Sequence, residues 1–242
     1  MKYIIMLTLM FLSITVGACE ESQDINPDDQ NLLIRSVQVT NLERFGINVW
    51  EIEVEGAAGA SVPTAAGQLD GAPVLGYVFP TNLRPTDVGF SSTEGIVAMA
   101  LTAHPDFDDT PLWDENNDQV YDNDGVEWHA HWVVLVEDER VDGGLAVKQF
   151  DASDPEVLLP PTNPGMPMYM DSPGFQVVTD GAFIRVIVPM YRMNNQSSFS
   201  YDGVTAYMQV NTSLSDKPML GVYEVYSVAS GDLSLPYQVS KE

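Results

Sequence analysis

The histidines of this chain all lie in or beside one strongly acidic stretch. They are His104, His129 and His131. No Lys or Arg stands between Arg84 and Arg140, and the acids that lie among or next to the histidines are Asp106, Asp108, Asp109, Asp114, Glu115, Asp118, Asp122, Asp124 and Glu127. Carboxylates packed this closely repel one another, so they must be well solvated or bind a cation. We therefore expect metal binding in this stretch.

The sequence Trp-His-Ala-His-Trp at 128–132 is the most specific signal. On a strand, His129 and His131 point to the same face, about 6.5–7 Å apart along the backbone. Two imidazoles placed in this way can converge on Zn²⁺, Cu²⁺ or Fe²⁺. The intervening Ala130 and the flanking tryptophans would face the core. The alternative is that the histidines form local hydrogen bonds and bind no metal.

Further ligands for this pair must come from elsewhere in the stretch. His104 is the third histidine and follows an apolar run, at the end of an expected strand. Oxygen ligands are available from Asp106, Asp108, Glu127 or Glu137. The predicted transition-metal site is therefore the histidine pair with His104 and one or more of these carboxylates.

A second metal is predicted in residues 114–125. The oxygens of Asp114, Asn116 and Asp118 have the alternating spacing of a calcium loop, and Asp122 and Asp124 repeat it. The segment resembles the aspartate-rich calcium loops of exported bacterial proteins. It departs from an EF-hand, because Gln119 stands where glycine is expected, Gly125 stands where a bidentate glutamate is expected, and no helices flank it. Ca²⁺ is the cation expected here, and a solvated loop without metal is the alternative.

Two families share fragments of the histidine pattern. His129, His131 and Trp132 resemble the strand pair of alpha-carbonic anhydrases, but that family needs a later histidine and none follows residue 131. His131, Glu137 and Gly144 resemble a cupin motif, whose spacing differs and whose second histidine motif is absent. Neither family is assigned.

Alternating methionines form a third candidate. Met166, Met168 and Met170 have thioethers that are soft ligands for Cu(I). Methionine is also common packing material over a core. Packing over the core is therefore the expected role of these methionines, and copper binding is the alternative.

The elements that must position these residues are predicted to be mostly β-strands. Alternating or continuous apolar runs predict strands at 32–40, 48–56, 74–79, 95–102, 128–136, 204–211 and 220–228, with a hairpin at 175–188. Loops are expected at 104–127, which is acidic, and at 151–174, which holds six prolines. No sustained helical period is present. The fold class predicted is all-β, an antiparallel β-sandwich with long acidic and Pro-rich loops.

The N-terminal segment predicts export. Residues 4–16 are largely apolar, and Val16, Gly17, Ala18 and Cys19 resemble the lipobox of bacterial lipoproteins. The resemblance implies a signal peptide at 1–18, a flexible tether at 19–30 and a single β-sandwich domain at 31–242. It also implies acyl chains such as palmitate on Cys19. An ordinary signal peptide followed by an unrelated cysteine is the alternative.

The resemblance also implies a location. Lipid on Cys19 would anchor the chain to a membrane of the cell envelope. Glu20 stands where an inner-membrane retention signal has aspartate, which favours the outer membrane. We therefore expect the water-soluble domain to face the periplasm or the cell surface.

Charge narrows the possible partners. A formal net charge of −25 argues against binding to nucleic acid or to anionic lipid surfaces. No protein or glycan partner is indicated.

The function predicted is a lipid-anchored, extracytoplasmic, non-enzymatic metal-binding domain. One alternative is a metal-dependent enzyme that uses His129 and His131 with Glu127 or Glu137 as base. Another is a passive cell-surface interaction module.

Overall fold

The computed structural model describes residue 26 and residues 28–242. The predicted signal peptide, Cys19 and most of the predicted tether lie outside the described residues. Asp29 and Gln30 are described, and both are bound to the domain: Ser61 donates to the Asp29 carboxylate, and the Gly56 N–H donates to the Gln30 carbonyl at 2.8 Å. Among the described residues, no helix has the length and apolar character needed to cross a membrane.

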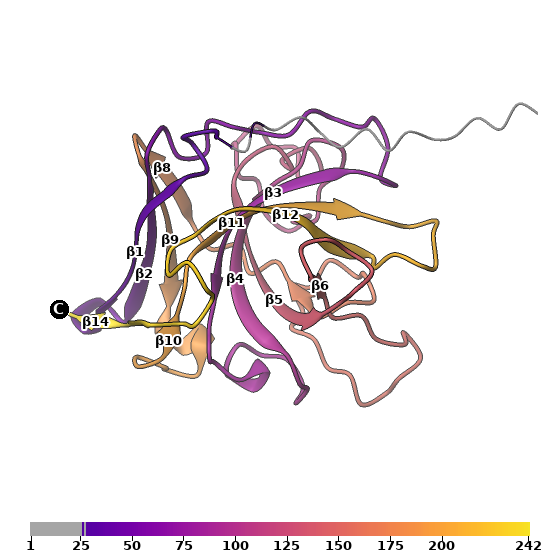
Figure 1. Ribbon diagram of the computed structural model, residues 1–242. Helices are drawn as coiled ribbons and strands as arrows, with labels where there is room; N and C mark the ends of the chain where they lie inside the picture. The colour runs from indigo at the N-terminus through magenta and orange to yellow at the C-terminus, as the bar shows by residue number, and fades with distance from the viewer. Residues whose placement is uncertain (1–25, 27) are drawn as a thin grey trace, which may run out of the picture.

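A five-stranded sheet forms one layer of the molecule. Its strand order is β14-β1-β2-β9-β8, and all pairs are antiparallel except β1 with β14. The strands are β1 (Ile34–Leu42), β2 (Ile47–Val54), β8 (Val177–Asp180), β9 (Phe183–Pro189) and β14 (Ser240–Lys241). These strands stand together on one side of the molecule in Figure 1.

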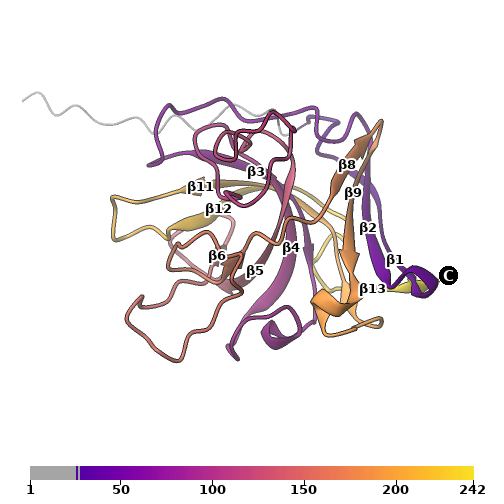
Figure 2. The same cartoon turned by 180° about the vertical axis from the view of Figure 1, so that it is seen from behind.

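The other layer is a second sheet that closes on itself. Its order is β4-β3-β11-β12-β6-β5-β7, and β4 also pairs with β5, so six of the strands form a closed antiparallel barrel with β7 on its edge. The strands are β3 (Pro73–Pro80), β4 (Ile96–Ala103), β5 (His129–Glu137), β6 (Leu145–Val147), β7 (Met170–Asp171), β11 (Val204–Val210) and β12 (Leu220–Val228). Figure 2 shows the two layers from behind. The predicted all-β sandwich is confirmed, and the closure of one layer into a barrel is an addition.

The remaining elements are short. β10 (Ser200–Tyr201) pairs with β13 (Tyr237–Gln238). The helical elements among the described residues are the 3-10 turns η1 (Glu43–Phe45), η2 (Pro85–Asp87) and η3 (Met190–Met193). Residues 104–127 contain no strand, and 151–174 contain only β7, as the acidity and the prolines of these loops predict.

The closed barrel divides the interior into two cores. Along β4, the large residues Val97, Met99 and Leu101 face the five-stranded sheet, whereas Ala98 and Ala100 face the barrel interior. This alternation of large and small side chains suits a narrow barrel, whose inner wall has little room. It also explains why β3 and β4 are apolar throughout, since both of their faces are covered.

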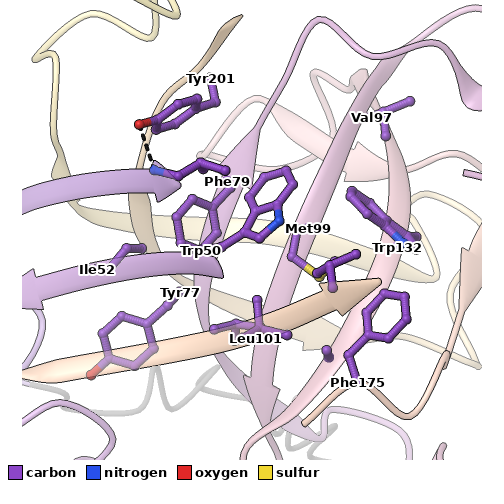
Figure 3. Packing of buried hydrophobic residues seen from close by; sticks show 14 of the residues in the cluster. Trp50, Ile52, Tyr77, Phe79, Val97, Met99, Leu101, Trp132, Phe175 and Tyr201 are labelled. Atoms are coloured by element: carbon purple, nitrogen blue, oxygen red, sulfur yellow. Dashed lines mark hydrogen bonds between the residues drawn. The ribbon is translucent and has the colours of Figure 1, made fainter. Parts of the chain in front are cut away.

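Aromatic side chains fill the core between the layers. Trp50 of β2 is fully buried and meets Trp132 of β5 edge-on, with ring centroids 5.7 Å apart. Figure 3 shows this contact, together with the Tyr201 hydroxyl, which accepts a 2.8 Å hydrogen bond from the Val39 N–H. This packing fixes the rotation of β5 about its own axis. With Trp132 in the outer core, the histidines on either side of Ala130 must point into the barrel.

Candidate metal centre

The structure brings the three histidines together with one aspartate at an end of the barrel. His129 and His131 project from the same face of β5, as predicted, and His104 follows the last residue of β4. The register pairs Thr102 with His129, which places His104 next to the histidine pair. The fourth member is Asp109, from the acidic loop. One ligand atom from each of these four residues lies within 4.8 Å of every other.

The distances within this group are short and similar. The Asp109 Oδ1 lies 3.3, 3.2 and 3.3 Å from the Nε2 atoms of His104, His129 and His131. The Nε2 atoms of His104 and His129 are 3.0 Å apart. A tetrahedron of ligands around Zn²⁺ with bonds of about 2.0 Å has edges of about 3.3 Å. Four of the six spacings, those from Asp109 to the three rings and that between His104 and His129, therefore match the edges of such a tetrahedron, and all six lie within 4.8 Å.

Hydrogen bonds orient the imidazole rings. The Nδ1 of His104 lies 2.9 Å from the Phe107 carbonyl oxygen, and the Nδ1 of His129 lies 2.7 Å from the Glu127 carbonyl oxygen. A carbonyl only accepts, so each of these Nδ1 atoms carries a proton and donates it. In a neutral ring this leaves the Nε2 lone pair free for a metal.

Ser172 orients the third ring in the same way. Its hydroxyl donates to the Asp109 backbone carbonyl at 2.7 Å, and its oxygen lies 3.1 Å from the Nδ1 of His131. Because the hydroxyl proton is used on the carbonyl, Ser172 accepts from the His131 Nδ1–H. The same serine therefore holds His131 and the backbone of Asp109.

Two polar atoms at the centre have no hydrogen-bond partner among the described residues. They are the Asp109 Oδ1 and the His131 Nε2, and both residues are buried. The nearby Thr102 hydroxyl lies 3.2 Å from a different atom, the His129 Nε2. Buried atoms of this kind are costly when left unpaired. A proton could form a hydrogen bond between only two of these atoms. A metal ion could bind the Asp109 Oδ1 and all three ring Nε2 atoms at once.

Electrostatics keep Asp109 ionised. Burial alone would raise the pKa of its carboxyl group, but in the metal-free centre positive charge on the neighbouring His131 and His104 rings holds that pKa well below its ordinary value. The centre is therefore a buried anion surrounded by three nitrogen ligands. This set suits a divalent transition metal and is unlike the oxygen cage that Ca²⁺ prefers.

Several of the predicted carboxylates support the loop that carries Asp109. The Asp108 carboxylate accepts hydrogen bonds from the Thr110 N–H at 2.6 Å and the Asp124 N–H at 2.8 Å. The buried Asp124 accepts from the Glu115 N–H at 3.0 Å. The Gly125 carbonyl accepts from the His104 N–H at 2.6 Å. These bonds tie the acidic loop to the end of β4.

The other predicted ligands lie apart from the centre. Asp106 accepts from the N–H groups of Ala66 and Gly67. Glu127 is exposed, and only its backbone carbonyl reaches His129. Glu137 is exposed at the far end of β5.

The predicted calcium loop is folded by its own hydrogen bonds. Asp114 accepts from the N–H groups of Asp118 and Gln119, Asn116 accepts from the Asp118 N–H, and Asp118 accepts from the Val120 N–H. Asp122 is exposed. Among the described residues, the only group of three or more acidic, histidine or cysteine side chains close enough to share a metal is the His104–Asp109–His129–His131 group. Calcium binding by the loop stays a prediction.

Asp109 is the member of the candidate centre that the sequence did not single out. It stood among the acids of the stretch, but nothing in its spacing separated it from Asp106 and Asp108. Its neighbour Thr110 is also buried, and an Asp-Thr pair buried within an acidic loop shows that the chain turns inward there. That signal depends on burial, which the sequence does not display.

Comparisons with known proteins identify no relative. No family model, no curated protein and no solved structure matches this chain. The geometry of the centre is therefore the basis for assigning a function.

Proposed function

We propose that this protein is a lipid-anchored, extracytoplasmic metal-binding protein of the cell envelope, and that its metal is a divalent transition ion held by His104, Asp109, His129 and His131. The observation that carries the proposal is the set of near-equal distances from Asp109 Oδ1 to three Nε2 atoms, 3.2–3.3 Å. Three neutral imidazoles and one carboxylate in a tetrahedron are ligands suited to Zn²⁺. Cu²⁺ has the same preference for imidazole and is the closest competitor.

Four protein ligands favour a binding role over catalysis. Structural zinc sites are usually closed by four side chains, whereas catalytic sites use three and leave a position for water. The two glutamates considered as bases, Glu127 and Glu137, are both exposed, and neither side chain belongs to the group. We therefore propose a non-enzymatic function.

Metal analysis of the full-length chain tests the proposal. The protein is purified without chelators, and its metal content is measured by plasma mass spectrometry before and after reloading with Zn²⁺, Cu²⁺ and Ca²⁺. The expected result is one equivalent of transition metal, with Zn²⁺ retained in competition with excess Ca²⁺. The absence of any bound transition metal after reloading would refute the proposal.

The anchor is tested separately, because it depends on other residues. Cells that express the chain are fed radiolabelled palmitate, and the wild-type chain is compared with Cys19→Ser. We expect label in the wild-type chain and none in the variant. Label that persists in the variant, or is absent from both chains, would refute lipidation at Cys19 without affecting the metal centre.

A further inference from the structure

A cavity inside the barrel shares a wall with the metal centre. Its volume is about 80 Å³, and His104, Asp109 and His131 lie on its wall. The remaining wall is mostly aliphatic or thioether, with side chains from all six barrel strands, β7 and the Pro-rich loop. The cavity therefore extends from the metal centre into the apolar interior of the barrel.

Polar side chains occur at only one end of this wall. They are three residues of the candidate centre, His104, Asp109 and His131, and Thr102, whose hydroxyl lies 3.2 Å from the His129 Nε2. A water molecule needs two to four polar partners to remain in a cavity, and an apolar cavity stays dry and binds apolar molecules. The wall therefore favours a molecule that is apolar along most of its length and has one polar atom at the end next to the metal centre.

Small side chains make the space. Ala100 of β4 and Ala206 of β11 line the cavity, and Gly76 of β3 pairs with Ala206. At Gly76 a Cβ would lie 2.7 Å from the Met208 Cε, so methionine already fills the volume that this glycine leaves. A cavity of about 80 Å³ has room for only a few heavy atoms.

We propose that the barrel interior binds a short aliphatic molecule with a single lone-pair donor, and that this donor becomes an additional ligand of the metal. The inference rests on the proposed function, since the donor needs a metal to bind. Catalytic zinc sites sometimes expand to five ligands, and the same expansion at this four-ligand centre would let the donor bind without displacing Asp109. The aliphatic chain of the molecule would lie against Ala100, Ala206 and the methionines.

The test uses 1-propanethiol as probe and Co²⁺ as a coloured substitute for Zn²⁺. The full-length chain in lipid nanodiscs is loaded with Co²⁺, and its visible spectrum is followed during titration. Binding through sulfur, with the thiol proton released to solvent, is expected to produce a saturable sulfur-to-cobalt band. 2-Mercaptoethanol, which carries a hydroxyl group in place of the terminal methyl group, is expected to need at least a tenfold higher concentration.

Variants separate the cavity from the metal. Ala206→Leu fills the cavity from a strand that supplies no ligand, and Ala60→Leu is a matched change at an exposed position. We expect full cobalt content in both, with the thiol band shifted to at least tenfold higher concentration in Ala206→Leu alone. Ala100→Leu repeats the test from another strand if Ala206→Leu does not fold.

The outcomes distinguish the two proposals. Bound Co²⁺ with no spectral response to 1-propanethiol, or an equal response in the wild-type and cavity-filled chains, would overturn the inference and leave the metal centre intact. A wild-type chain that binds no Co²⁺ would refute the proposed function and this inference together.

Discussion

The buried centre and the exposed acidic loop contain the same kinds of side chain and use them differently. In the loop at 114–123, the carboxylates of the half-buried Asp114 and the exposed Asp118 accept N–H groups of their own turn. In the centre, the single carboxylate of Asp109 is buried and has an oxygen without a hydrogen-bond partner. The density of negative charge therefore does not mark the candidate metal site. The site is distinguished by the burial of one unpaired anion among three ring nitrogens.

The largest expected effect comes from removing that anion. Asp109→Asn keeps the shape of the side chain and removes the charge that neutralises the metal, so we expect the affinity for Zn²⁺ to fall at least about 100-fold. Asp114→Asn is the matched control in the exposed loop and should change the affinity less than about twofold. Competition with a chromophoric chelator measures both values. Equal losses in the two variants would remove the distinction between the regions.

Removing the metal should destabilise the barrel. At a free Zn²⁺ concentration of about 100 times Kd, binding contributes about 2.7 kcal/mol. For a domain of this size that corresponds to a fall in Tm of about 5–10 °C when EDTA is added. Differential scanning calorimetry of the wild-type chain and of Asp109→Asn measures it. In the variant, whose affinity is at least about 100-fold lower, EDTA should lower Tm by no more than about 2 °C.

Gly125 links the two regions and should tolerate no side chain. A Cβ there would lie 1.9 Å from the Phe107 carbonyl oxygen and 2.5 Å from the His104 carbonyl oxygen. Gly125→Ala must therefore displace the turn that holds the His104 ring. We expect a loss of about 1–3 kcal/mol in the free energy of unfolding, and weaker Zn²⁺ binding. Denaturant titration with Zn²⁺ and with EDTA measures both, and an unchanged stability would show that the turn is not closely packed.

Orientation of the rings gives a smaller effect. Ser172→Ala removes the acceptor for the His131 Nδ1–H and leaves the ligand set intact, so we expect a 10- to 100-fold loss of Zn²⁺ affinity. Ser153→Ala is the control, because Ser153 also hydrogen-bonds an aspartate, Asp151, but at an exposed position. Ser172→Thr should restore most of the affinity. A Ser172→Ala variant with wild-type affinity would contradict the role assigned to this hydroxyl.

Much of this fold was predictable from the sequence, and so was part of the site. The Trp-His-Ala-His-Trp pattern predicted both the strand and its rotation, because tryptophan and histidine alternate with a period of two and the tryptophan face is the more apolar. The long strands were predicted to within a few residues. By contrast, β6, β7, β10, β13 and β14 were not predicted, because each has only two or three residues and depends on pairing with distant strands.

Neither the closure of the barrel nor the place of Asp109 in the centre could be predicted, because both depend on contacts between distant parts of the chain. Closure depends on β4 pairing with β5 across the acidic loop, which is a long-range contact. Asp109 differs from Asp106 and Asp108 only in its burial, and that burial results from the same closure. The alternating aspartates of the loop are a stronger sequence signal, although in this structure they serve mainly as turn acceptors.

The smallest expected effect concerns calcium at that loop. Since its carboxylates already accept backbone N–H groups, we expect Ca²⁺ to bind with Kd in the millimolar range and to raise Tm by no more than about 2 °C. Asp118→Asn should remove the rise and leave Zn²⁺ binding unchanged. Calorimetric titration of the Zn²⁺-loaded chain measures this, and micromolar Ca²⁺ binding would show that the loop rearranges into a true cation site.

X-ray absorption spectroscopy at the zinc edge identifies the ligands of the bound ion and so tests the assignment of the four residues to one metal. We expect about three imidazole nitrogens and one oxygen at about 2.0 Å in the Zn²⁺-loaded full-length chain, with imidazole scattering reduced by one ring in His131→Ala. A first shell made mainly of oxygen, with no imidazole scattering, would contradict it.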